Sequence, residues 1–122
     1  MATYSKNLLS GSTQGAPIAV VATASTGTTI HSTGTSSTAF DEIWLYATNT
    51  STAAVVLTIQ YGGTATLNQI QQTIPANSGL TLIVPGLVLT GSGGASPTAS
   101  NVYAYAGTAS VVNISGYVNR VA

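Results

Sequence analysis

The sequence predicts an all-β fold, an antiparallel β-sandwich of jelly-roll type with about eight strands and an extended N-terminal arm. Helical periodicity is absent, whereas about eight short apolar segments are separated by clusters of Gly, Pro, Asn and Ser. Thr and Val favour strands, and Gly and Ser favour turns, so the composition agrees with the spacing. Many short strands of this kind are typical of two packed sheets.

The N-terminal segment differs from the rest of the chain. Residues 1–15 are polar and contain Gly, and we expect them to form the extended arm, with Tyr4, Leu8 and Leu9 as anchors. The remaining residues, 16–122, are expected to form a single β-sandwich domain, because a chain of 122 residues suffices for one hydrophobic core.

The domain begins with weak strand signals. Residues 16–23 (APIAVVAT) form the first predicted strand. Residues 24–39 hold few apolar side chains, and only a short strand around Thr28–His31 is expected there.

The strongest strand signals lie at 40–49 and 53–61, separated by a turn at Asn49–Ala53. Both segments alternate with period two, which is typical of half-buried strands. We expect Gly62–Gly63 to close this pair as a hairpin. Along 40–49 the apolar side chains expected on one face are Ile43, Leu45 and Ala47, and the opposite face carries Trp44, Tyr46 and Thr48.

The C-terminal half contains four further strand signals. Residues 67–74 form one, and residues 80–90 form a long one that Pro85–Gly86 is expected to kink or split, because Pro cannot donate to a central ladder. Residues 101–106 and 110–118 are expected to form a final hairpin. The predicted core consists of Ile43, Leu45, Val55, Leu57, Ile59, Leu82, Val84, Val112 and Ile114.

Charged residues make up only 3% of the chain, against about 25% in ordinary soluble domains. The four charged residues are Lys6, Asp41, Glu42 and Arg120. Two basic residues so far apart in the sequence cannot form the basic patch that binds nucleic acid or an anionic membrane. We therefore expect no nucleic-acid or membrane partner. The N-terminus also lacks the basic and apolar regions of a signal peptide.

The sequence offers little for catalysis or metal binding, and we expect neither an enzyme nor a cofactor. A Ser–His–Asp triad would have to use His31 with Asp41 or Glu42, and no Ser lies in a G-x-S-x-G turn. His31 is expected to be a surface or interface polar residue. One His and two adjacent carboxylates are too few for a metal site within one chain, although a site shared across a three-fold axis stays open.

Aromatic residues allow a second interpretation. Trp44 and several Tyr, including Tyr103 and Tyr105, could form a platform on which sugars stack. We favour the interpretation that these side chains are cross-strand packing pairs or subunit-interface contacts, where Tyr and Trp are enriched.

The sequence resembles small β-rich virion proteins of tailed bacteriophages in three stretches, DEIWLYATNTSTAAVVLTIQYGG (41–63), TIPANSGLTLIVPGLVLTGSG (73–93) and VVNISGYVNRV (111–121). The resemblance covers roughly residues 40–121 and not the arm. It implies a capsid decoration (cement) protein, made in the host cytoplasm, that binds the major capsid protein on the outside of the phage head and stabilises it, commonly as a homotrimer. It implies no catalytic residues. The alternative is a tail-tip, fibre or carbohydrate-binding module that uses exposed tyrosines.

Under the first interpretation, the arm and the few charges are the candidates for contacts between subunits. An extended arm suits strand addition to a neighbouring sheet, and a charge in so uncharged a chain is a candidate for a specific contact. The residues expected to contact another subunit or the capsid are Tyr4, Leu8, Leu9, Asp41, Glu42 and Arg120.

Overall fold

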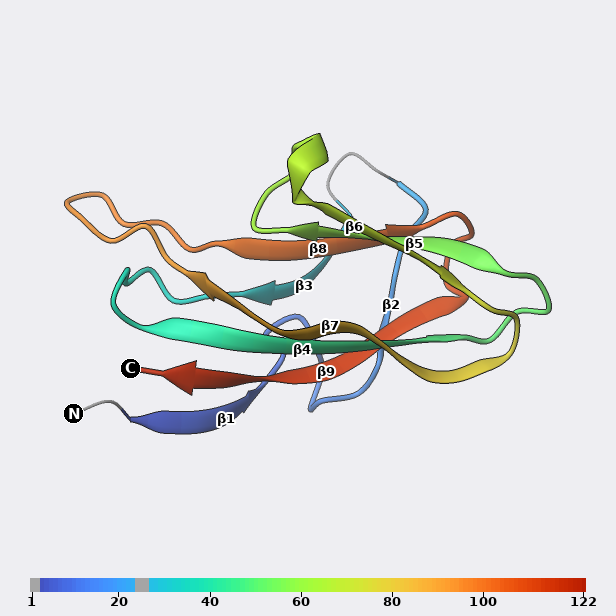
Figure 1. Cartoon of the computed structure of the whole chain (residues 1–122), viewed down its shortest axis with the longest axis horizontal. Helices are drawn as coiled ribbons and strands as arrows, with labels where there is room; N and C mark the ends of the chain where they lie inside the picture. The colour runs from blue at the N-terminus through green and yellow to red at the C-terminus, as the bar shows by residue number, and fades with distance from the viewer. Residues whose placement is uncertain (1–2, 24–26) are drawn as a thin grey trace.

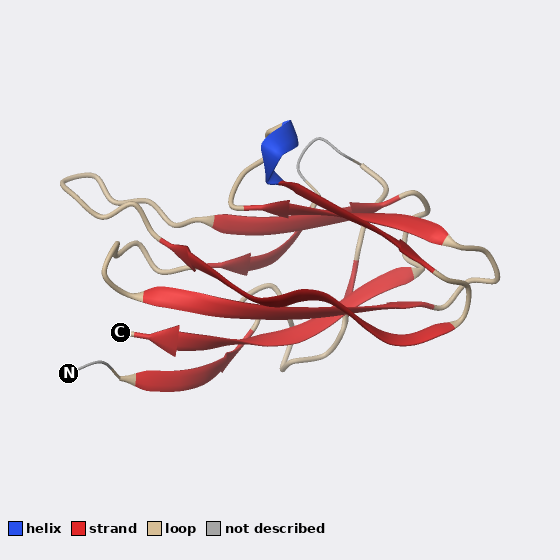
Figure 2. Ribbon diagram, in the orientation of Figure 1, coloured by secondary structure: helices blue, strands red, loops and turns tan. Residues whose placement is uncertain are grey.

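A computed structural model describes residues 3–23 and 27–122 and shows two antiparallel sheets packed as a sandwich (Figure 1). One sheet has five strands: β1 (Tyr4–Leu8), β2 (Ile18–Ala19), β9 (Val112–Val121), β4 (Phe40–Asn49) and β7 (Ser78–Thr90). The other has four: β3 (Thr28–Ser32), β8 (Asn101–Ala106), β5 (Val55–Tyr61) and β6 (Gln69–Ile74). Within the described ranges the single helical element is one 3-10 turn, η1 (Thr66–Asn68), between β5 and β6 (Figure 2).

The strand pairing confirms the predicted jelly roll. In the five-stranded sheet the order is β1-β9-β4-β7, with β2 also on β9, and in the four-stranded sheet it is β3-β8-β5-β6. Early strands therefore pair with late ones in nested fashion: β1 and β2 with β9, β3 with β8, β4 with β7, and β5 with β6. This is the pattern of one long antiparallel hairpin rolled into two sheets.

Alternation along the strands places the core between the two sheets. On β4 every second side chain is buried, from Asp41 through Asn49, and its opposite side chains are half-buried on the outer face. Eight of the nine predicted core residues are buried, at most 5% exposed. The exception is Leu82, which is 46% exposed.

Leu82 was expected in the core because it alternates with Val84, and the register of β7 explains why this is wrong. Val84 pairs with Leu45 and faces inward, but Leu82 pairs with Tyr46, so one extra residue lies between these two pairs. Such a bulge moves the next side chain to the opposite face.

Pro85 lies on β7, which is an edge strand with no partner beyond it among the described residues. The missing N–H of Pro85 therefore costs no ladder bond on that side. A second irregularity in the β4–β7 register falls at Gly86, which has a φ of +84°. The predicted split does not occur, because β7 continues through Pro85 and Gly86, and the expected irregularity is this register shift.

Two predicted hairpins are wrong, because each connection crosses between sheets. β4 and β5 lie in different sheets, and Gly62–Gly63 instead precede the antiparallel partner of β5, which is β6. The segments 101–106 and 110–118 likewise fall on β8 and β9 of opposite sheets. Turn residues mark where the chain reverses direction. The same residue types occur in hairpins and in loops that connect the two sheets, so they do not show which kind of connection forms.

The predicted arm contains an edge strand of the same chain. β1 pairs with β9 from Tyr4↔Val121 to Leu8↔Tyr117 (Figure 1). The following turn is held by a backbone hydrogen bond from Gly11 to Ile30, and Leu9 is 2% exposed in the core. Residues 1–2 of the arm and residues 24–26 of the stretch with few apolar side chains lie outside the described residues.

Candidate functional site

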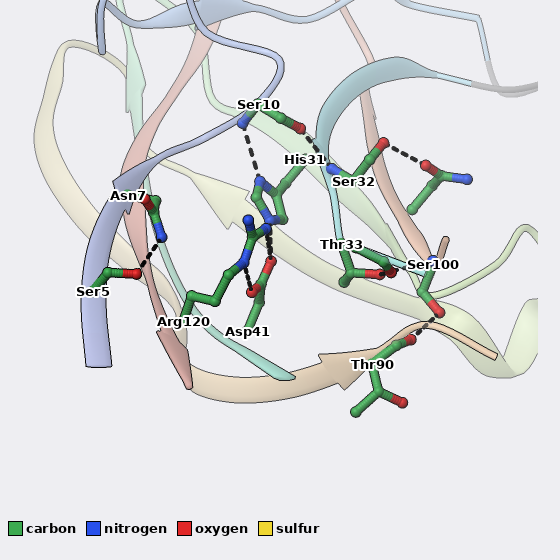
Figure 3. A network of polar contacts seen from close by, with 12 residues as sticks. Ser5, Asn7, Ser10, His31, Ser32, Thr33, Asp41, Thr90, Ser100 and Arg120 are labelled. Atoms are coloured by element: carbon green, nitrogen blue, oxygen red, sulfur yellow. Dashed lines mark hydrogen bonds and ion pairs between the residues drawn. The ribbon is translucent and has the colours of Figure 1, made fainter. Parts of the chain in front are cut away.

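Three of the five Lys, Arg, His, Asp and Glu side chains gather inside one end of the sandwich. His31 on β3, Asp41 on β4 and Arg120 on β9 converge there, beside the turn that carries Ser10 (Figure 3). His31 Nε2 lies 2.6 Å from Asp41 Oδ2, and Arg120 holds Asp41 from its Nε at 2.7 Å and its Nη2 at 2.9 Å. Asp41 and His31 are each 1% exposed. The cluster ties three strands and the N-terminal segment together.

The carboxyl group of Asp41 is ionised in this setting. Burial raises its pKa, but the hydrogen bonds and charges of Arg120 and His31 outweigh burial, and the net pKa lies below the ordinary 3.8. The hydrogen bond to Asp41 also raises the pKa of Arg120. Burial, followed by the negative charge of Asp41, raises the pKa of Tyr61 far above its usual range.

The tautomer of His31 follows from its two hydrogen bonds. The backbone N–H of Ser10 donates to Nδ1 at 3.0 Å, so Nδ1 is an acceptor and the proton sits on Nε2, which donates to Asp41. The Ser10 hydroxyl accepts a hydrogen bond from the Ser32 N–H instead of facing the ring.

These contacts define what the cluster can do. Both ring nitrogens are engaged and the ring is buried, so His31 is not positioned to take a proton from a bound substrate. The expectation that His31 lies at the surface is wrong, because its partners are the interior Asp41 and a backbone N–H. His31, Asp41 and Arg120 form a polar cluster in the core, which we call the polar clamp.

Metal-ligand groups do not gather in the described residues: no three of His, Cys, Asp or Glu lie close enough to hold one ion. Sharing a site across a three-fold axis would need His31 or Asp41 at the surface. Both are interior, and the Asp41 oxygens are already occupied by Arg120 and His31.

A second candidate site is the side of the five-stranded sheet that points away from the four-stranded sheet, which we call the outer face. It is rich in aromatic and aliphatic side chains, because the outward positions of β1, β9, β4 and β7 carry them in register. Its residues are Tyr4, Lys6, Leu8, Phe40, Glu42, Trp44, Tyr46, Leu82, Val88, Ser115, Tyr117, Asn119 and Val121.

The centre of the outer face is an aromatic pair. Trp44 and Tyr117 are cross-strand neighbours, and their rings stack with centroids 6.2 Å apart and an interplanar angle of 11°. Gly86 lies against the indole, where a Cβ would come within 2.9 Å of it. The Lys6 Nζ lies 4.9 Å from the centre of the Tyr117 ring.

Glu42 completes this group. Its Oε1 accepts hydrogen bonds from Trp44 Nε1 at 2.7 Å and from Asn119 Nδ2 at 3.1 Å. The hydrogen bond from Trp44, followed by that from Asn119, lowers the pKa of Glu42. The outer face therefore has a stacked aromatic pair at its centre with one cation and one anion beside it.

The six residues expected to make contacts fall into two groups. Tyr4 and Leu8, 76% and 58% exposed, and Glu42 lie on the outer face. Leu9, Asp41 and Arg120 are engaged within the chain. A role in contacts between subunits stays a prediction for all six.

Sequence reasoning missed the polar clamp, although one signal for it was present. Period-two alternation puts Asp41 on the same face as Ile43, which indicates burial. Nothing local identifies Arg120 and His31 as its partners, because they lie 79 and 10 residues away along the chain.

The tyrosines singled out for sugar binding also have places in the structure. Tyr103 and Tyr105 are half-buried on the outward side of β8, and Tyr105 Oη lies 3.4 Å from Gln69 Nε2.

No helix among residues 3–23 and 27–122 is long and apolar enough to cross a membrane.

Comparison with known proteins assigns no relative to this chain. No family model matches it, and no curated protein or solved structure is significantly similar to it.

Proposed function

We propose that this protein is a structural virion protein, a decoration protein that binds the outside of a bacteriophage head and stabilises it as an oligomer. The observation that carries the proposal is the outer face, an array of aromatic and aliphatic side chains on a chain that is only 3% charged. Exposed apolar patches of this kind mark interaction surfaces.

The low charge supports the same proposal. Many identical copies packed on one particle repel each other if each carries a large net charge, and this chain has none. Hydroxyls supply most of the polarity instead, with 20 Thr and 14 Ser.

The fold is compatible with this role, as an argument by analogy. Jelly rolls recur in viral capsid proteins and also in lectins and enzymes, so the fold alone selects no function. The capsid role is chosen on the resemblance that we infer from residues 41–63, 73–93 and 111–121, to which the comparisons with known proteins add no support.

The direct test uses particles assembled with and without the protein. We expect the protein to copurify with intact particles, and particles that lack it to release their genome at a lower temperature or chaotrope concentration. Absence of the protein from purified particles, or equal stability of the two preparations, contradicts the proposal.

A matched pair of variants tests which surface attaches to the particle or to other copies. Leu8→Ser removes an exposed aliphatic side chain from the outer face, and Val56→Ser makes the same kind of change on the four-stranded sheet, where Val56 is 47% exposed. We expect Leu8→Ser alone to lower the number of copies per particle. Equal occupancy for both variants argues against the outer face.

A carbohydrate-binding module is the second candidate, and the stacked Trp44–Tyr117 pair with Asn119 and Glu42 beside it favours it. Such a group can stack on a sugar ring and bond its hydroxyls. Titration with oligosaccharides, monitored by Trp44 fluorescence, distinguishes the two functions. Saturable binding that is lost on Tyr117→Ala favours the module, and loss on Tyr103→Ala or Tyr105→Ala places it on the four-stranded sheet.

A further inference from the structure

The four charged side chains are used in two different ways. Asp41 and Arg120 pair with each other inside the sandwich. Lys6 and Glu42 have no oppositely charged partner in the described part of the chain, and their recorded contacts are with neutral groups. Both lie on the outer face, so an opposite charge from outside the chain can reach them.

Their placement on the sheet is symmetric about β9. Asn119 pairs with Lys6 on β1 on one side and with Glu42 on β4 on the other. Lys6 and Glu42 therefore stand in one row across the sheet, about 5 Å to either side of β9, because neighbouring strands lie about 4.8 Å apart.

We propose that a second copy of this chain docks on the outer face. The two copies are related by a two-fold axis that runs parallel to β9 and lies between their two outer faces. Such an axis exchanges the two sides of β9. It lays β1 of each copy over β4 of the other, so that Lys6 of one copy meets Glu42 of the other, twice. Interfaces with this symmetry are self-complementary.

The neighbouring rows fit the same operation. Tyr4 and Phe40 flank Val121, and Leu8 and Trp44 flank Tyr117, again with one residue on β1 and one on β4. The axis therefore places Tyr4 over Phe40 and Leu8 over Trp44, apolar against apolar. Tyr117 and Asn119 lie near the axis and meet their own counterparts.

The size of the face predicts a weak dimer. The axis over β9 sets β1, β9 and β4 of one copy over β4, β9 and β1 of the other, and β7 of each copy has no opposite strand. Three strands about 4.8 Å apart, opposed over the roughly 17 Å of β1, give a projected area of about 250 Å². A standard interface buries about 800 Å² per partner, so we expect the pair to be weak and reversible. Sheets packed face to face in this way align their strands to within about 30°.

The inference uses the surface on which the proposed function rests, but it commits to a different partner. It specifies a two-fold pair, whereas the resemblance to phage proteins implies a trimer. Protein that binds particles but stays monomeric in solution overturns the pair and leaves the decoration role standing. A dimer that is absent from particles overturns the decoration role and leaves the two-fold pair standing.

Analytical ultracentrifugation of the full chain over a range of concentrations is the primary test. We expect a reversible dimer. Lys6→Glu and Glu42→Lys each place like charges opposite one another at both contacts, and we expect each to weaken the dimer about 10- to 100-fold. Thr73→Glu adds a negative charge at an exposed position on β6 of the other sheet and is expected to leave the dimer unchanged.

Mixing the two reversed variants tests the symmetry itself. In a mixed pair, both contacts again join opposite charges, so Lys6→Glu protein and Glu42→Lys protein should associate with each other more tightly than either does with itself. Restored association also shows that both variants are folded. A monomeric wild-type chain, single variants that dimerise normally, or a mixture that does not associate overturns the proposal.

Discussion

Replacing Asp41 by Asn tests the polar clamp with almost no change in side-chain volume. Asp41 accepts three short hydrogen bonds, two from Arg120 and one from His31, at 2.6–2.9 Å. Asp41→Asn removes the negative charge and leaves one carbonyl oxygen, which can still accept from His31. The Arg120 guanidinium loses its bidentate partner.

The expected cost follows from the exposure of each partner. Removing one member of a buried ion pair costs about 3–5 kcal/mol. The Arg120 side chain is 37% exposed and can turn toward water, which reduces the cost. We therefore expect a loss of about 2–3 kcal/mol, which lowers the Tm of a domain of this size by about 10 °C.

The pH dependence gives the sharper result. The pKa of Asp41 is lowered in the folded protein, so its ionisation stabilises the fold above the unfolded-state pKa, and this stabilisation is lost as the pH falls through the folded pKa. The difference in unfolding free energy between wild type and Asp41→Asn should be full near neutral pH and shrink below about pH 3.8.

Thermal and chaotrope unfolding followed by circular dichroism at several pH values measures this difference. Glu42→Gln is the control, because Glu42 is the adjacent residue on the opposite face of β4. It should change the Tm much less than Asp41→Asn. Low protein concentrations are needed, because Glu42 also lies on the proposed dimer face. A loss under about 1 kcal/mol for Asp41→Asn, or a difference independent of pH, contradicts the clamp.

Three further outcomes are expected. Leu57→Ala should cost about 2–5 kcal/mol in chemical denaturation and Leu82→Ala far less, because Leu57 is 0% and Leu82 46% exposed; equal losses would place Leu82 in the core. Gly86→Ala should destabilise the fold and shift the Trp44 emission, because Gly86 has a φ of +84° and a Cβ there meets the indole; an unchanged spectrum contradicts this packing. Deleting residues 2–10 should lower the Tm, since it removes β1 and a buried leucine; an unchanged Tm shows that the segment adds nothing to the fold.

Strand positions and faces were largely predictable, and pairing partners were not. The alternation along 40–49 correctly assigned the inward and outward sides of β4. The errors at the two predicted hairpins and at Leu82 share one cause. Each depends on register and on which sheet a strand joins, and these are set by contacts between residues far apart in the sequence.

The outer face was likewise only partly predictable from the sequence. Alternation put Trp44 and Tyr46 on one face, so an exposed aromatic group could be expected. The row in which Lys6 and Glu42 flank Asn119 could not be expected from the sequence. It requires the alignment of three strands that come from the two ends and the middle of the chain.

The sequence alone determined that this chain folds as a β-sandwich with a sparsely charged surface, because period-two patterning and composition are local properties. Only the tertiary structure decided the roles of the two adjacent carboxylates. Asp41 can be buried because Arg120 and His31 reach it from β9 and β3, and their hydrogen bonds offset the cost of removing its charge from water. Glu42, one residue further on, stays on the outer face with no cation to pair with in the described part of the chain.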